Sequence, residues 1–253
     1  MEYEKNNNFL HQTKCDYDGM IKALDKLCDS YSYIEVGTLG NSFMGRQIPI
    51  VSLGVGESSV VYVGAVCGRE YMTTVALIKF INEYCEVYSR CGRMYGNKLE
   101  MVFSERTIHV IPMLDVDGVE YATNGIRDKE TLYDKLCDGE ADFECERGAL
   151  KNFIRFNKAI KGAVTLRQQK EGIEFFGNAK SSVRAMSMAK YLSKITGFSI
   201  DGFYDENEAM FRELDISHVS LRCGELKEKK RDDSVFSIYA NARQFLFEMP
   251  FMI

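Results

Sequence analysis

The sequence lacks the features that would place the chain on nucleic acid, in a membrane or outside the cell. Its 37 acidic residues outnumber its 32 basic ones, which gives a formal net charge of −5, and no dense basic run is present. We therefore expect no nucleic-acid partner, because phosphates are bound by a basic patch. No apolar stretch approaches the roughly 18 residues of a spanning helix, and residues 1–8 do not resemble a secretory signal. These absences predict a cytoplasmic protein with no membrane partner.

A disulfide framework is also not expected, although the sequence has eight cysteines. Their spacings are irregular and the chain is long, so most are expected to be reduced and buried as small apolar side chains. With 253 residues, of which 45% are hydrophobic, the chain can fill one large core. We predict a single domain over residues 1–253, in which residues 1–12 could be disordered.

Hydrophobic periodicity predicts an alternation of helices and strands, which favours an α/β fold. Residues 125–152 are polar and aperiodic and are expected to form a surface excursion within the domain. The predicted helices lie within 17–31, 71–90, 186–195 and 234–249, and the predicted strands within 33–38, 47–53, 60–66, 107–113 and 219–223.

The segment Cys67-Gly68-Arg69-Glu70 is the most informative part of the chain. An apolar run precedes it and a helical pattern follows, so it is predicted to lie on a strand-to-helix turn. A zinc enzyme would carry His-x-x-Glu at such a turn. Here a thiol replaces the imidazole, and any functional interpretation depends on that change.

Several segments, in order along the chain, resemble the motifs of one known family. Cys67–Glu70 lies where the family's His-x-x-Glu pair binds zinc. The chain thus resembles the zinc metallocarboxypeptidases of the carboxypeptidase A type (funnelins), above all their bacterial single-domain members. The resemblance implies one α/β domain with a mixed, twisted β-sheet flanked by helices on both faces. The other matching segments are GTLGNSFMGRQI (37–48), IPMLDVDGV (111–119), RFNKAIKGAVTLR (155–167) and residues 216–224, which resemble iG-x-S-x-x-G-r-x-I, vPMvNPDGv, RWxANxxGVDLNR and iPxxTiExG.

Carried over to this chain, the family's zinc site is incomplete. A catalytic zinc needs three protein ligands and an open position for water. The resemblance gives Cys67 in place of the first ligand and retains the second, Glu70. The third, a His on a strand after the helix at 186–195, has no counterpart, so we expect that strand region to be deleted. We therefore expect no metal and no cofactor, although zinc is the family's metal; if a metal is bound, Cys67 and Glu70 are its candidate ligands.

The family's catalytic base is also replaced. The glutamate that takes a proton from zinc-bound water falls on Arg222, and an arginine cannot act as a base at neutral pH. A guanidinium about 5 Å from Zn²⁺ would also repel it by about 7 kcal/mol at an effective dielectric of about 20. We therefore expect no catalytic residue and interpret Cys67, Glu70 and Arg222 as degenerate positions.

Three arginines suggest a cationic cleft in place of the zinc site. Arg69 matches an arginine that many family members keep inside the zinc motif. Arg167 matches the arginine of the Asn-Arg pair that holds a substrate's terminal carboxylate, with Leu166 in place of the Asn. Arg222 would be a third guanidinium. Guanidinium groups bind carboxylates and phosphates through paired hydrogen bonds, so the three are candidate ligands for an anion; the alternative is that they pair with local acids such as Glu70.

Five residues have a structural interpretation as well as a functional one. Cys67 could be a metal ligand or a nucleophile, but no His follows it closely and a buried thiol is favoured. His109, inside a predicted strand, is interpreted as a core histidine. His218, in the loop before the last predicted strand, could pair with Cys67. Asp115 and Asp117 are expected to fix a turn.

The resulting functional hypothesis is a metallocarboxypeptidase-like pseudoenzyme whose cleft binds a peptide C-terminus or another small anion, such as a cell-wall peptide. One alternative is an active zinc carboxypeptidase that uses Cys67, Glu70 and an unrecognised third ligand. A second alternative is a structural or partner-binding protein with a collapsed cleft. The sequence does not identify a protein partner.

Overall fold

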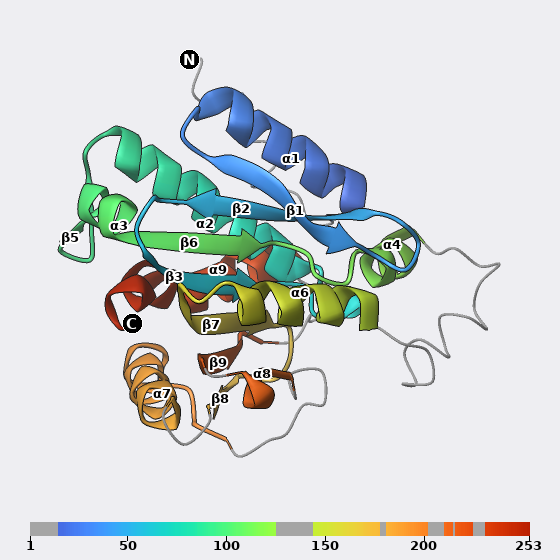
Figure 1. The fold of residues 1–253 in the computed structure, drawn as a ribbon. Helices are drawn as coiled ribbons and strands as arrows, with labels where there is room; N and C mark the ends of the chain where they lie inside the picture. Colours follow the sequence, from blue (N-terminus) through green and yellow to red (C-terminus); the bar gives the residue numbers. More distant parts are fainter. Residues whose placement is uncertain (1–14, 125–143, 178–180, 202–209, 215, 225–230) are drawn as a thin grey trace.

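The computed structural model describes residues 15–124, 144–177, 181–201, 210–214, 216–224 and 231–253 (Figure 1). The predicted tail over 1–12 and residues 125–143 of the predicted excursion lie outside these ranges. Among the described helices, none is long and apolar enough to cross a membrane.

The centre of the fold is a mixed sheet in which seven described strands follow the order β1-β2-β6-β3-β7-β9-β8. Strands β6, β3, β7 and β9 are parallel to one another. Strand β2 pairs antiparallel with β6, β8 pairs antiparallel with β9, and the edge strand β1 pairs antiparallel with β2. The mixed sheet that the family resemblance implies is thus confirmed. The strands are β1 (Glu35–Asn41), β2 (Gln47–Leu53), β3 (Ser58–Val63), β6 (Arg106–Ile111), β7 (Ile160–Arg167), β8 (Gly172–Phe176) and β9 (Ser217–Arg222).

Helices cover both faces of this sheet (Figure 1). On one face Tyr62 of β3 donates a hydrogen bond to the carbonyl of Leu246 in α9, at 2.7 Å. Successive strand residues point to opposite faces, and His109, the partner of Val61, packs its ring edge-on against Phe153 of α6 on the other face. The first face carries α2 (Met72–Ser89), α7 (Ser182–Thr196) and α9 (Arg231–Glu248), and the second carries α6 (Glu144–Phe156) and the short α8 (Met210–Glu213).

The predicted helices form where their apolar spacing places them. In α1 (Tyr17–Ser30) the residues Met20, Ala23, Leu24 and Leu27 are buried, and the side chain of Asp16 caps the helix by accepting from the Gly19 N–H at 2.9 Å. Helix α7 is followed by Gly197 as its C-cap, in the left-handed conformation (φ 75°) that glycine adopts at little cost. The remaining elements are η2 (Gly68–Glu70), β4 (Arg93–Met94), β5 (Asn97–Lys98), α3 (Leu99–Glu105), α4 (Val116–Asn124) and η5 (Met249–Phe251).

Three local predictions differ from the structure. Residues 144–152, the last part of the predicted excursion over 125–152, belong to helix α6, whose Glu146, Leu150 and Ile154 are buried at helical spacing. His218 lies within β9 and not in a loop before it. None of the seven described cysteines forms a disulfide, and only three of them are buried: Cys15, Cys85 and Cys223. The prediction that most cysteines are buried was therefore wrong.

Candidate functional site

The residues singled out in the sequence meet at the C-terminal ends of the parallel strands β3, β7 and β9. Cys67 and η2 follow β3, Arg167 is the last residue of β7, and Arg222 is the last residue of β9. In the register of β7 and β9 the two arginines are direct partners. Since like charges opposite each other destabilise a sheet, each of them needs its own compensating acid.

Arg167 is compensated by Glu70. Its Nε donates to both oxygens of the Glu70 carboxylate, at 2.7 and 3.0 Å, and the side-chain amide of Gln169 donates to one of them at 3.1 Å. The side chains of Arg167 and Glu70 are only 2% and 5% exposed. This is a buried ion pair, in which each charge depends on the other because neither is hydrated.

The turn that carries Glu70 is fixed by its own hydrogen bonds. The Glu70 N–H donates to the carbonyl of Cys67 at 2.8 Å, and the Thr73 hydroxyl donates to the Glu70 carbonyl at 2.7 Å. The same hydroxyl accepts from the Ala65 N–H at 2.7 Å. Strand end, turn and the start of α2 are therefore locked together, which holds the Glu70 carboxylate in place.

Arg222 is compensated by two acids. Its Nε lies 3.5 Å from Oε1 of the buried Glu174, and its terminal nitrogen binds Asp201, whose side chain is 38% exposed. A hydrogen bond from Ser199 and the contact with Arg222 lower the pKa of Asp201. The group at the position of the family's base is thus a cation held between carboxylates.

Arg69 and Cys67 differ from this buried set. Arg69 is exposed on η2, and no ion pair of it occurs among the described residues. Cys67, whose thiol was expected to be buried, is half-buried at the beginning of the same turn and is not part of a disulfide. Of the three candidate anion ligands, Arg69 alone is presented to solvent, whereas Arg167 and Arg222 contact acids of the protein.

Of the two described histidines, His218 is a core residue and His109 is half-buried. His218 is fully buried between the rings of Phe211 and Phe176, with centroids at 3.8 and 5.4 Å, and its Nε2 lies 3.0 Å from the Thr165 hydroxyl. Burial and the charge of Arg167 lower its pKa to about 3, so the ring is neutral.

His109 contacts the Ser52 hydroxyl through Nδ1 at 3.0 Å, and burial lowers its pKa to about 4. His109 thus lies inside a strand with a hydrogen-bond partner, as predicted, but it is half-buried and not fully in the core. The ring of His218, which the sequence offered as a possible base for Cys67, is occupied on both faces and at Nε2 by core contacts.

Asp115 and Asp117 fix turns, as the sequence predicts. The buried Asp115 accepts from the Gly118 N–H at 2.8 Å, and burial raises its pKa to about 7. Asp117 accepts from the Met44 N–H at 2.7 Å and pairs with Arg46 at 2.6 Å. Both carboxylates are used to order the backbone next to the site.

The donor set does not fit a catalytic zinc ion. Across the part of the chain that the structure describes, no group of three or more His, Cys, Asp or Glu side chains is arranged to hold a metal. Of the two expected ligands, Glu70 directs both oxygens at Arg167, and a buried cation is the worst neighbour for a second one.

Sequence reasoning offered Glu70 as a partner of the arginines, but it missed the two acids that compensate Arg222 and the Gln169 amide beside Glu70. Glu174 lies on β8, which periodicity did not predict, and Asp201 and Gln169 follow strand or helix ends. The alternation Gly-Ile-Glu-Phe-Phe over 172–176, with Ile173 and Glu174 on opposite faces, was the available signal.

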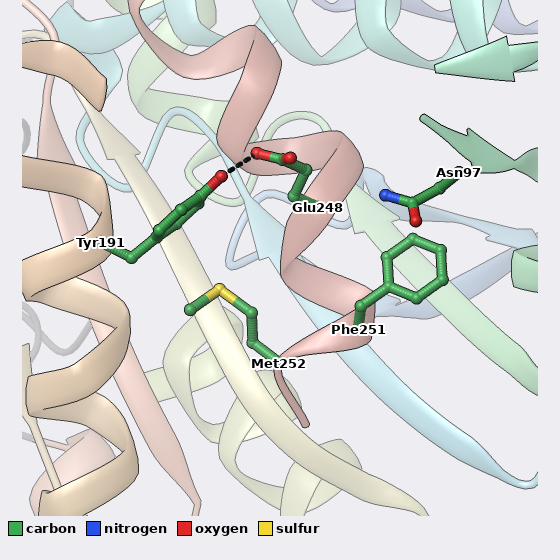
Figure 2. Close-up of a pocket in the computed structure, with 5 residues that line it drawn as sticks. All are labelled: Asn97, Tyr191, Glu248, Phe251 and Met252. Carbon is green, nitrogen blue, oxygen red and sulfur yellow. Dashed lines mark hydrogen bonds between the residues drawn. The ribbon is translucent and has the colours of Figure 1, made fainter. Parts of the chain in front are cut away.

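A surface pocket lies beside the C-terminal residues 248–252 (Figure 2). Asn97, Tyr191, Glu248, Phe251 and Met252 line it, and the Tyr191 hydroxyl donates to the Glu248 carboxylate. The C-terminal segment that lines the pocket approaches Gly162, near the beginning of β7. Arg167 is at the other end of that strand, so the pocket is remote from it.

The sequence matches known proteins over part of its length. The family model for zinc carboxypeptidases matches residues 20–186. The γ-D-glutamyl-L-diamino acid endopeptidase 1 of Lysinibacillus sphaericus is 27% identical over 125 residues, which are 49% of this chain and 32% of that protein. The uncharacterized protein YqgT of Bacillus subtilis (strain 168) is 26% identical over 123 residues, 47% of this chain and 32% of the relative. The matched part thus spans about a third of the length of both relatives.

Solved structures share the fold over nearly the whole chain. Thrombin activatable fibrinolysis inhibitor has a TM-score of 0.71 at 11% identity, covering 95% of this chain and 74% of that one. The carboxypeptidase A from Helicoverpa armigera has a TM-score of 0.64 at 10% identity, with 98% and 80% covered. The metallo-carboxypeptidase from Burkholderia cenocepacia has a TM-score of 0.61 at 10% identity, with 93% and 70% covered. At these identities the likeness concerns the fold alone.

Proposed function

Because the chain belongs to the zinc carboxypeptidase family, we propose that it is a non-hydrolysing member of that family, a pseudoenzyme that binds the carboxylate of a peptide C-terminus or another small anion. One observation carries this proposal: the carboxylate at the zinc-binding position, Glu70, is neutralised by Arg167. The proposal includes the cytoplasmic location, which the seven free thiols support.

Both halves of peptide hydrolysis lack their groups in the described site. Metal-assisted hydrolysis needs carboxylate or imidazole lone pairs directed at the metal, and those of Glu70 accept hydrogen bonds from Arg167 and Gln169. It also needs a base for the attacking water, and Arg222 cannot supply one. The described residues thus favour recognition over turnover.

Anion recognition depends first on Arg69. Its exposed guanidinium can pair with a carboxylate without breaking a contact among the described residues. Arg222 can contribute second, because its partner Asp201 is partly exposed and an incoming carboxylate could replace it. Arg167 is bound to a buried acid and is expected to act through the shape of the site and not by direct contact.

The ligand class follows from the bacterial relative. The Lysinibacillus sphaericus relative is named as an endopeptidase of γ-D-glutamyl-L-diamino acid linkages. We propose that this chain binds a peptide of the same class, whose free carboxylates suit exposed guanidinium groups.

Calorimetric titration with γ-D-glutamyl-L-lysine tests this proposal, with the C-terminal amide of the same peptide as the ligand control. We expect binding of the free acid that weakens with salt. Arg69→Ala should lower the affinity by about 10- to 150-fold, the equivalent of a charged hydrogen bond of about 1.5–3 kcal/mol. Arg184→Ala is the matched control, since Arg184 is also exposed but lies on α7, which begins beside the start of β9. Equal affinities for acid and amide, or equal losses in both variants, would contradict a carboxylate site at Arg69.

A second candidate function is that of a structural protein without a ligand. The pairing of Arg167 and Arg222 with internal acids favours it, because those two guanidinium groups are already neutralised. It predicts that neither peptide nor inorganic phosphate raises the melting temperature at any salt concentration.

A further inference from the structure

The contact between Arg167 and Glu70 has the geometry of a cation shared by two carboxylate oxygens. Nε lies 2.7 Å from one oxygen and 3.0 Å from the other. The carboxylate thus holds this nitrogen through both oxygens, as a bidentate carboxylate holds a metal ion. Both side chains are buried, and a single positive charge is therefore needed at this point.

We infer that the guanidinium of Arg167 takes the place of the metal ion as the counter-charge of Glu70, and that position 167 is the place of the missing third ligand. This inference rests on the proposed loss of zinc. It differs from the role that the sequence motif gives Arg167, which is to hold a substrate carboxylate.

The sheet order explains why position 167 can serve in this way. Strand β7 lies directly between β3 and β9, so its last residue is adjacent to both the turn of Glu70 and the position of Arg222. A ligand that shares a metal with Glu70 must come within a few ångströms of its oxygens. Arg167 and Gln169 both donate hydrogen bonds to that carboxylate.

Side-chain chemistry turns this position into a specific prediction. The Nε2 atom of a histidine is separated from Cα by the same number of bonds as the Nε atom of an arginine. The substitution Arg167→His therefore removes the internal cation and brings a metal-binding nitrogen to the same carboxylate. Together with the thiol of Cys67 at the beginning of the turn, it completes a set of Cys, Glu and His, which zinc accepts.

The test is a titration of the full chain with Co²⁺ and Zn²⁺, followed by visible absorption and by metal content after desalting. We expect one ion per chain in Arg167→His and none in the wild type, with a thiolate-to-Co²⁺ absorption band that Cys67→Ser removes from the variant. Arg167→Met is the matched control, since it removes the same charge without adding a ligand, and it should bind no metal.

Each outcome decides the inference. A folded Arg167→His variant that binds no metal, or binds no more than Arg167→Met, overturns it and leaves the proposed function intact. Metal bound by the wild type overturns both. If Arg167→His is unfolded without metal, we expect Zn²⁺ to restore its far-ultraviolet circular dichroism but not that of Arg167→Met. If Zn²⁺ does not restore the spectrum of Arg167→His, the inference is also overturned.

Discussion

Each member of the buried pair of Glu70 and Arg167 should be costly to remove while the other remains. Replacing Arg167 by Met leaves the Glu70 carboxylate buried beside the Gln169 amide, without the guanidinium that neutralises its charge. Breaking a buried pair by removing one partner costs about 3–5 kcal/mol, whereas replacing both partners by apolar residues of similar volume is often close to neutral. We therefore expect Arg167→Met to lower the free energy of unfolding by about 3–5 kcal/mol, and Glu70→Leu/Arg167→Met to lower it by less.

Urea unfolding followed by circular dichroism measures both values, and a double-mutant cycle gives the coupling energy. The chain contains a suitable control in the pair of Glu86 and Arg90 on the surface of α2, with side chains 39% and 59% exposed. An exposed i,i+4 pair of this kind contributes about 0.3–0.5 kcal/mol. The reasoning is refuted if Arg167→Met costs no more than Arg90→Met, because Glu70 then does not depend on the guanidinium.

Two further predictions concern pH. Burial raises the pKa of Asp115 from 3.8 to about 7, so the folded state holds a proton that the unfolded state releases, and stability should fall as pH rises towards 7, by at most about 1.4 kcal/mol per pH unit. Asp115→Asn should flatten the dependence of the unfolding free energy between pH 5 and 8. Burial also raises the pKa of the neighbouring Glu146, which stays in the variant. An unchanged slope would show that Asp115 is ionised throughout. For His218 the pKa is lowered to about 3, so stability is present above the unfolded pKa and is lost as pH falls from about 6.5 towards 3. Nuclear magnetic resonance should find its imidazole neutral down to pH 4, and a titration near 6 would contradict its position in the core.

Elements with strong periodicity were predictable from the sequence. The spacing of apolar residues in α1 and the glycine that ends α7 each match one local rule, and the structure follows them. The apolar runs of β2 and β6 likewise form central strands. In these elements local preference and tertiary packing agree.

Elements that depend on distant partners were not predictable in the same way. Strand β8 is five residues long and is held by its antiparallel neighbour β9. This pairing brings Glu174 of β8 beside Arg222 of β9. The motif resemblance identified the family correctly but fixed attention on Arg167 as a substrate ligand. Its contact with Glu70 joins residues 97 positions apart, and only the order of the strands brings them together.

The central claim is that this carboxypeptidase fold has replaced its zinc ion by an internal ion pair. Metal analysis of protein purified without chelator and then equilibrated with Zn²⁺ tests it most directly. We expect no stoichiometric zinc, and Cys67→Ser should leave the result unchanged. One zinc per chain in the wild type, lost in Cys67→Ser, would contradict the account and support an active zinc enzyme.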